Sequence, residues 1–135
     1  MSTNPLLTDV SLDPEDACDC VHPVAVMAAR RVLGEVPSIE GVADIFAILG
    51  DPTRVRVLTA LRAGELCVSD LAVATGVNRT TVSHQLRVLR SHRLVQRRRE
   101  GKVVYYAIDV DHVDALLDMA ATHAGEAVTR TERLA

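Results

Sequence analysis

Aromatic residues are almost absent from this chain of 135 residues, which has no tryptophan, two tyrosines and one phenylalanine. A core of stacked aromatic rings is therefore excluded, and any core must be aliphatic, built from leucine, valine, isoleucine and alanine. Leucine and alanine are good helix formers, so this composition favours a mostly helical protein. The length fits one compact domain.

Long apolar runs are also missing. No stretch approaches the roughly 18 residues that a membrane-spanning helix needs, and the N-terminus lacks the basic and apolar regions of a secretory signal. We therefore expect a cytoplasmic protein with no membrane partner. Its cysteines are few, namely Cys18, Cys20 and Cys67. In the cytoplasm, closely spaced cysteines more often bind metal or do redox chemistry than form structural disulfides.

The charge of the chain is unevenly distributed. The net charge is only −3, yet residues 78–102 carry eight basic side chains against Glu100 alone. A basic block inside an acidic chain indicates one surface directed at a polyanion. The alternative is a charged face that is simply solvated.

Two short helical patterns joined by a glycine turn lie within and just before this block. They are "CVSDLAVATG" and "VNRTTVSHQLRVLRSHRLV". The second begins after Asn78, a good N-cap, and the spacing of Val82, Leu86 and Leu89 predicts its buried face. Two helices around a short glycine turn are typical of a helix-turn-helix, whereas an ordinary helical hairpin is the alternative. The opposite face of the second helix carries Arg79, Thr80, Ser83, His84 and Arg87.

The next segment, "LVQRRREGKVVYYAI", has two β-prone runs on either side of Glu100 and Gly101, which predicts a hairpin. A helix-turn-helix followed by a basic hairpin is a winged helix. Its second helix enters a major groove while the wing reaches backbone phosphates. The predicted fold is thus mainly α with a small β-hairpin. The basic residues at the tip of the wing are Arg97, Arg98, Arg99 and Lys102.

The last helical pattern carries His112 and His123, 11 residues apart. Three turns take about 10.8 residues, so both histidines face the same way, but they are separated by about 16 Å along the axis. One chain therefore cannot bind one ion with both. Two antiparallel copies would bring His112 of one chain to His123 and Glu126 of the other, and symmetry would give two equal sites. Asp109 or Asp111 offers a fourth ligand for zinc, while two ordinary surface histidines are the alternative.

In these residues the chain resembles the ArsR/SmtB family of metal-responsive bacterial repressors. The resemblance covers residues 39–128 and rests on "ELCVSDLA", "TVSHQLRVLR" and the spacing of His112, His123 and Glu126. It implies a homodimeric winged helix-turn-helix with its first and last helices at the dimer interface. It also implies binding to an inverted-repeat operator, which metal binding weakens to release genes for metal efflux or resistance.

The resemblance implies a division of the chain and a set of DNA contacts. We expect a flexible N-terminal arm over 1–22, a DNA-binding and dimerisation domain over 23–128 and a tail over 129–135. The implied contacts are Arg79, Thr80, Thr81, Ser83, His84, Gln85 and Arg87 in the helix, with Arg97, Arg98, Arg99 and Lys102 in the wing.

Two metal sites occur in the family, and both have counterparts here. One joins cysteines of the N-terminal arm to the cysteine of "ELCV", which implies a thiolate clamp of Cys18, Cys20 and Cys67, with His22 or Asp19 as a further donor. Soft thiolates favour cadmium, lead or zinc as the inducer. Ser69 stands where cadmium- and lead-sensing members often have a second cysteine. The other site comprises His112, His123 and Glu126, and Val110 stands where the family usually has an aspartate.

Several alternatives remain from the sequence. The three thiols also suit a switch driven by oxidation, or arsenic or antimony sensing. A purely structural zinc protein would unfold without its metal. A zinc hydrolase is disfavoured because the chain has no H-E-x-x-H pattern, no glycine-rich phosphate loop and no nucleophile elbow. We therefore expect a regulator that is not an enzyme.

Overall fold

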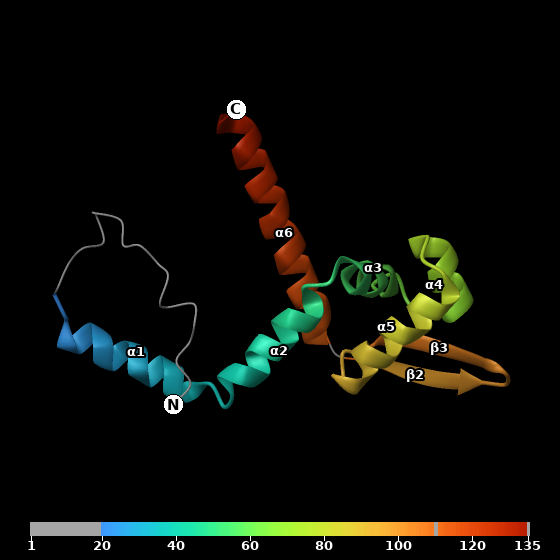
Figure 1. The fold of residues 1–135 in the computed structure, drawn as a ribbon, viewed down its shortest axis with the longest axis horizontal. Coiled ribbons are helices and arrows are strands. Elements are labelled where there is room, and N and C mark those ends of the chain that lie inside the picture. Colours follow the sequence, from blue (N-terminus) through green and yellow to red (C-terminus); the bar gives the residue numbers. More distant parts are fainter. Residues whose placement is uncertain (1–19, 110, 135) are drawn as a thin grey trace. The chain divides into compact units, whose positions relative to one another are not determined.

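The computed structural model describes residues 20–109 and 111–134, with side chains as far as residue 129. Its contacts divide the chain into two compact units, residues 1–39 and 40–135, and each is described by itself (Figure 1). The first unit contains helix α1, Pro23–Glu35, which begins directly after His22 as predicted and has no buried residue. The predicted arm, residues 1–22, lies almost wholly outside the described residues.

The second unit opens with two helices in a row. Helix α2 spans Ile39–Leu49 and helix α3 spans Pro52–Leu61. Asp51 caps α3 by accepting a hydrogen bond from the backbone N–H of Thr53 at 3.4 Å, and Pro52 occupies the first turn, where its missing N–H costs nothing. This short connection places α2 and α3 in sequence directly before β1 and the helix-turn-helix.

The predicted helix-turn-helix is present. Helix α4 spans Val68–Thr75 and ends at Gly76, which adopts the left-handed conformation with φ of 71°. Helix α5 spans Arg79–Ser91, and the side chain of Asn78 accepts a hydrogen bond from the backbone N–H of Thr81 at 2.9 Å. The buried residues of α5 are Val82, Leu86 and Leu89, as the spacing predicted. One face of α5 is therefore fixed to the core, and the other remains at the surface.

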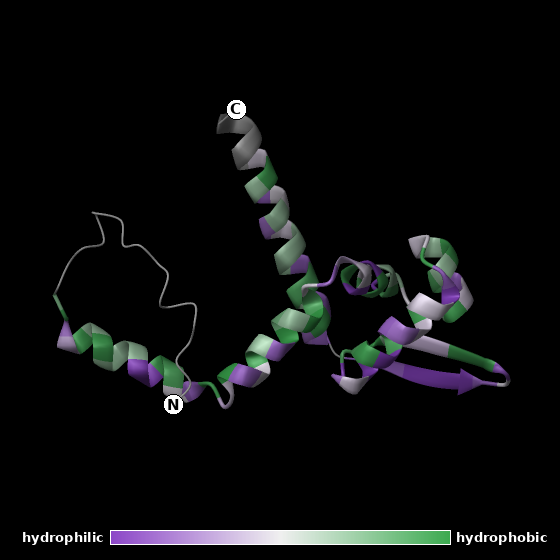
Figure 2. Cartoon of the chain, viewed as in Figure 1, coloured by the Kyte–Doolittle hydropathy of each residue, from purple (hydrophilic) through white to green (hydrophobic). Residues whose placement is uncertain are grey.

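The hairpin is part of a three-stranded antiparallel sheet with strand order β1-β3-β2. The strands are β1, Leu66–Cys67, β2, Val95–Glu100, and β3, Val103–Ile108. Glu100 pairs with Val103 across a two-residue loop that begins with Gly101 at φ 61°, a conformation for which glycine is suited. We call the β2–β3 hairpin the wing. Figure 2 shows β2 as hydrophilic along most of its length.

Helix α6 spans Asp111–Leu134, so residues 129–134, which were expected to form a tail, continue the helix. Its first half is anchored. Val113 and Leu117 are buried in the core, and Arg62, at the end of α3, donates a hydrogen bond from Nε to Asp114 Oδ1 at 2.6 Å. From residue 118 to 129 every residue of α6 is exposed.

The core is aliphatic, as the composition predicted. Its buried hydrophobic residues come from α3, α4, α5, the start of the wing and α6, so these elements form one packed unit behind α5. They are Val57, Leu58, Leu61, Leu71, Val82, Leu86, Leu89, Leu94, Val95, Val113 and Leu117. The mainly helical, winged helix-turn-helix prediction is confirmed. Among the described helices, none has the length and apolarity to cross a membrane.

Candidate functional site

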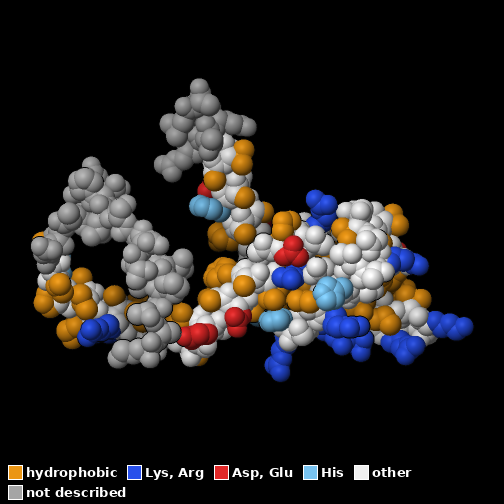
Figure 3. All heavy atoms as spheres, viewed as in Figure 1, with side chains coloured by type: hydrophobic (Ala, Val, Ile, Leu, Met, Phe, Trp, Pro, Cys, Tyr) orange, Lys and Arg blue, Asp and Glu red, His pale blue; other side chains and the backbone are white. Residues whose placement is uncertain are grey.

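The outward face of α5 carries polar and cationic side chains. Its members are Arg79, Thr80, Ser83, His84 and Arg87, and all five are exposed. We call this set the basic face of α5. Figure 3 shows several Lys and Arg side chains over α5 and the wing, with others elsewhere on the visible surface. Because Val82, Leu86 and Leu89 fix the opposite side of the helix, the basic face has a defined orientation.

Two residues of the predicted DNA contacts, Thr81 and Gln85, are only half-exposed. Gln85 Oε1 accepts a 2.7 Å hydrogen bond from Arg54 Nε, and Arg54 also donates from Nη1 to the carbonyl of Ile48 at 3.2 Å. Gln85 is therefore held by the protein itself. Sequence reasoning missed Arg54, because no periodicity links two residues 31 positions apart.

Arg79 begins the basic face and is also engaged within the protein. Its guanidinium donates a hydrogen bond to the hydroxyl of Ser69 in the first turn of α4. This contact gives the serine a role in joining the two helices of the helix-turn-helix.

The three consecutive arginines of β2 do not share one environment. Successive side chains of a strand point to opposite faces, so Arg98 lies opposite Arg97 and Arg99. Arg98 donates to Glu65 and Glu100, at 2.7 Å and 2.8 Å respectively, and its guanidinium carbon lies 5.0 Å from the centroid of the Tyr105 ring. The hydrogen bond from Arg98 is the main cause that holds the pKa of the Glu65 carboxyl below its usual value.

At the tip of the wing, Arg99 donates from Nε to the carbonyl of Gly101 at 3.2 Å. Arg97, Arg99 and Lys102 are all exposed. Together with the basic face of α5, they form the candidate nucleic-acid interface, while Arg98 lies on the other face of β2.

Cys67 is a half-buried free thiol. It ends β1 and directly precedes α4, and its backbone N–H donates to Asp70 Oδ2 at 3.2 Å. The two described residues of the predicted N-terminal ligands, Cys20 and His22, belong to the other compact unit, and Cys18 lies outside the described residues. Cys20 is disulfide-bonded, so it must be reduced before it can serve as a thiolate ligand. The thiolate clamp therefore stays a prediction.

The predicted histidine site lies on α6. His112, His123 and Glu126 are all exposed on this one helix. Within the described part of the chain, no three His, Cys, Asp or Glu side chains gather closely enough to hold a metal ion. Because 11 residues of helix rise about 16 Å, His112 and His123 of one chain cannot bind the same ion, and the shared site stays a prediction.

The structure separates the two aspartates that sequence reasoning left as alternatives. Asp109 lines a cleft of about 500 Å³ together with His112, and α2 supplies Val42, Ile45 and Phe46 to the same cleft. Asp111 lines a different depression, near Arg62 and Asp114. Asp109 and His112 therefore share one surface, whereas Asp111 does not belong to it.

His92 and His84 have separate surroundings. His92 follows the last residue of α5, and its Nδ1 lies 3.0 Å from the carbonyl of Val88. A histidine in this place satisfies a free carbonyl at the helix C-terminus. His84 is part of the basic face of α5 and is exposed.

Comparison with known proteins decides the family. Residues 51–97 match the bacterial regulatory protein, arsR family. The chain is 42% identical to the transcriptional repressor SmtB homolog of Synechocystis over 130 residues, which cover 93% of this chain and 98% of the relative. The chain belongs to the ArsR/SmtB family of metal-responsive transcriptional repressors. It is a transcriptional regulator and not an enzyme.

Other ArsR/SmtB relatives extend this result. The cadmium resistance transcriptional regulatory protein CadC homolog of Staphylococcus aureus is 36% identical, over 83% of this chain and 94% of the relative. The solved homodimeric winged helix-turn-helix DNA-binding domain of a possible ArsR-family transcriptional regulator of Mycobacterium bovis has a TM-score of 0.61 and 38% identity. It covers 65% of this chain and 82% of that chain.

A second solved structure matches nearly the whole length of this ArsR/SmtB chain. It is the AntR antimony-specific transcriptional repressor, with a TM-score of 0.58 and 30% identity over 96% of this chain and 98% of that chain. These relatives thus include a regulator named for cadmium resistance and a repressor named as specific for antimony. The family membership fixes the kind of regulator, and the choice of inducer depends on this chain's own ligands.

Proposed function

We propose that this protein is a homodimeric repressor that binds an inverted-repeat operator in the cytoplasm and releases it when cadmium, lead or zinc binds. Release would derepress genes for metal efflux or resistance. The observation that carries the proposal is that one packed unit contains both a candidate DNA-binding surface and a candidate metal ligand. The surface is the basic face of α5 beside the wing, and the ligand is the free thiol of Cys67 at the start of α4.

For DNA binding, the basic face of α5 is suited to the major groove. Arg87 presents a donor fork for guanine or phosphate, and Ser83 and His84 offer hydrogen bonds to base edges. The wing side chains Arg97, Arg99 and Lys102 lie at the surface, where they suit phosphate contacts that fix the register of the protein without reading sequence.

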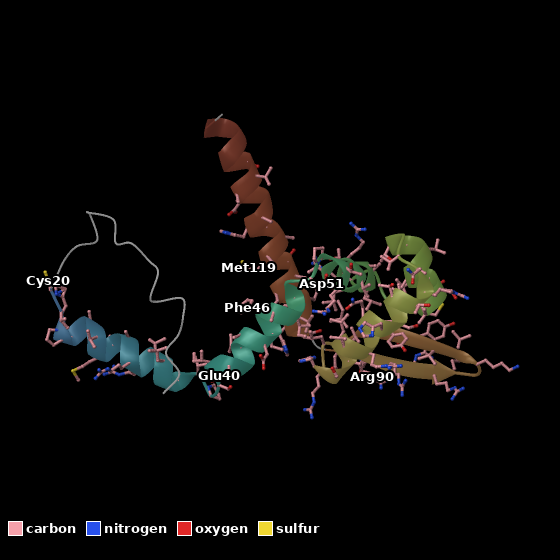
Figure 4. The ribbon with its side chains drawn as sticks, in the orientation of Figure 1. Cys20, Glu40, Phe46, Asp51, Arg90 and Met119 are labelled. Carbon is pink, nitrogen blue, oxygen red and sulfur yellow. The ribbon has the colours of Figure 1, made fainter. Side chains whose placement is uncertain are left out.

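For the homodimer, the support is exposed apolar surface on two helices of the second unit. Val42 and Phe46 of α2 are 45% and 64% exposed, and Met119 of α6 is 71% exposed (Figure 4). Large apolar side chains at the surface favour an interface. The Mycobacterium bovis domain, a neighbour in fold and sequence, is homodimeric.

The thiolates of Cys18, Cys20 and Cys67 would hold a soft or borderline cation, and His22 is the further donor. Three sulfurs suit lead or cadmium, and a fourth donor of nitrogen suits a tetrahedral zinc site. Cys67 supplies the link to DNA binding because it directly precedes α4, whose Ser69 accepts the hydrogen bond of Arg79. Metal binding at the sulfur of Cys67 would thus act two positions from Ser69, whose hydrogen bond with Arg79 reaches the start of α5.

The second ligand set is shared between subunits. Asp109 and His112 of one protomer would join His123 of the partner subunit and Glu126 of the partner subunit in an N/O site suited to zinc. We propose Asp109 in preference to Asp111, because Asp109 lines the same cleft as His112. His112 begins the anchored half of α6, so occupation of this site would act on the dimer interface.

The mechanism is a linkage between two binding equilibria. An inducer that binds the DNA-incompetent dimer more tightly than the DNA-bound one shifts the population by the difference in binding free energy. A coupling of about 3 kcal/mol would weaken operator binding roughly 150-fold.

A second candidate keeps the repressor and changes the signal. The fold likeness to the antimony-specific repressor AntR over 96% of this chain favours trivalent antimony or arsenic bound by the same three thiols. Oxidation of the same thiols is a related alternative.

The test is an anaerobic titration of the reduced apo-protein with cadmium, followed by the ultraviolet absorption of thiolate–metal bonds. The variants Cys67→Ser and His112→Ala are titrated beside the wild type, and operator binding is measured on the same samples. We expect one cadmium per subunit, with the absorption band and operator release both lost in Cys67→Ser and both retained in His112→Ala.

Retention of operator release in Cys67→Ser at wild-type cadmium concentrations would remove the thiolate clamp as the sensor. Loss of zinc-induced release in His112→Ala alone would then identify the α6 site as the regulatory one. Release by antimonite but not by cadmium would favour the second candidate.

A further inference from the structure

The guanidinium of Arg98 lies between two carboxylates, although its side chain remains at the surface. Its Nη2 lies 2.7 Å from Glu65 Oε2, and its Nε lies 3.3 Å and 3.2 Å from the two oxygens of the same carboxylate. On the other side, Nη1 lies 2.8 Å from Glu100 Oε2. Two carboxylates therefore face one guanidinium, which also rests on the ring of Tyr105.

These contacts distinguish Arg98 from its neighbours. Arg97 and Arg99 lie on the opposite face of β2, because side chains alternate along a strand. Two carboxylates beside Arg98 would repel a phosphate and would have to be displaced before a phosphate could take their place. The geometry is therefore poorly suited to a DNA contact by Arg98, although the sequence groups all three arginines together.

The same contacts link Arg98 to the position of Cys67. In the sheet, Cys67 of β1 pairs with Tyr105 of β3, and Tyr105 pairs in turn with Arg98 of β2. The three residues thus form one row across the sheet. Glu65 lies two residues before Cys67 and closes the row by its ion pair with Arg98. We call Glu65, Tyr105 and Arg98 the wing bracket.

We infer that Arg98 is a positioning residue that sets the wing against β1, and that the wing bracket transmits a change at Cys67 to the wing. The second part rests on the proposed function, and the first does not. Exposed ion pairs add little to stability, and Arg98 and Glu65 side chains are 49% and 43% exposed. Their contribution is one of geometry, because the bidentate pair ties Arg98 of β2 to Glu65, the residue directly before β1.

The first experiment compares the salt dependence of operator binding by the apo-protein. Each phosphate contact that is lost lowers the magnitude of the slope of log K against log salt by about one. We expect Arg99→Gln to lower the slope in this way. We expect Arg98→Gln and Arg98→Lys to keep the wild-type slope and to weaken operator binding by roughly two- to fivefold, the range that one exposed ion pair supports.

Three results would overturn the positioning role. One is a slope for Arg98→Gln as low as that of Arg99→Gln. Another is wild-type operator affinity of Arg98→Lys, since lysine can replace arginine at a phosphate but cannot reproduce the bidentate pair. The third is tighter binding and a steeper slope in Glu65→Gln, which would mean that Glu65 withholds Arg98 from DNA. Circular dichroism of each variant verifies that it is folded.

The second experiment measures the coupling. The ratio of operator affinities without and with cadmium is determined for the wild type and for Glu65→Gln, with the thiolate absorption band as a record of cadmium binding. We expect Glu65→Gln to bind cadmium with the wild-type stoichiometry. Its ratio of operator affinities without and with cadmium should be at least about threefold smaller than that of the wild type. An unchanged ratio would overturn the transmission role.

The two proposals fail in different ways. If wild-type operator binding does not respond to cadmium, the proposed inducer is wrong, and the salt slopes of the apo-protein still decide the role of Arg98. If the wild type responds and Glu65→Gln responds equally, the wing bracket is not the route although the sensor is correct.

Discussion

Arg54 and Gln85 are joined by a 2.7 Å hydrogen bond from the guanidinium Nε to the amide oxygen, which links α3 to the middle of α5. Arg54 is simultaneously bonded to the carbonyl of Ile48 near the end of α2 and lies 3.5 Å from the carboxylate of Asp51. The side chain of Arg54 thus connects the end of α2 and the start of α3 to α5, the helix that presents the basic face. Gln85 has a supporting role in this arrangement.

We predict that Gln85→Ala destabilises the protein more than it weakens specific DNA contacts. Hydrogen bonds to charged groups contribute about 1.5–3 kcal/mol when they are lost from a partly buried site. Urea unfolding monitored by circular dichroism measures the change. Gln96→Ala is the matched control, because Gln96 is exposed on β2. Equal stability of the two variants would contradict the assignment.

We predict that Arg87→Ala weakens operator binding strongly while it leaves the stability of the fold nearly unchanged. Arg87 is exposed on the basic face of α5, and loss of a base-reading arginine costs about 1–3 kcal/mol at its position. Gel shifts with operator and with unrelated DNA measure the loss. Arg56→Ala removes an exposed arginine of α3 as the control, and an operator affinity unchanged by Arg87→Ala would remove that residue from the interface.

We predict that Leu86→Ala lowers the free energy of unfolding by about 2–5 kcal/mol, because Leu86 is fully buried at the centre of the core. The same truncation at Val73 should change it by less than about 0.5 kcal/mol, because Val73 is 86% exposed on α4. Denaturant unfolding of both variants provides the measurement. A cost at Val73 comparable to that at Leu86 would show that the surface of α4 is covered in the assembled protein.

We predict that Asp109→Asn weakens zinc binding at the α6 site by at least about tenfold, whereas Asp111→Asn has little effect. The reason is that Asp109 shares the cleft of His112 and Asp111 does not. Competition with a chromophoric chelator gives both affinities. His123→Ala serves as the reference for a site that has lost an imidazole ligand, and the opposite order of the two aspartate variants would reject the choice of Asp109.

Local patterns were sufficient for the helix-turn-helix. Asn78 as a cap, Gly76 as a stop and the spacing of Val82, Leu86 and Leu89 specify two short helices, because capping and periodicity act over a few residues. Gly101 of the wing loop is another local signal, because a tight turn needs a residue that adopts positive φ. By contrast, β1 has only two residues, Leu66 and Cys67, and so offers no alternation from which a strand is predicted.

The end of α6 shows another limit of local patterns. Residues 129–134 continue the helix although the apolar spacing has faded by then, because nothing in that segment breaks a helix. The predicted tail was an inference from a weak pattern. The three arginines of β2 show the converse, since the sequence presents them as one cluster and the alternation of the strand divides them between two faces.

The sequence by itself determined the elements, the aliphatic core, the family resemblance and the set of ligand types, because these depend on composition, capping and short-range spacing. Tertiary structure alone decided that Gln85 accepts a hydrogen bond from Arg54 and that Arg98 contacts Glu65 and Tyr105. It also decided that Asp109 rather than Asp111 lines the same cleft as His112. These relationships join residues far apart along the chain, and only the packing of helices and the register of strands brings such residues together.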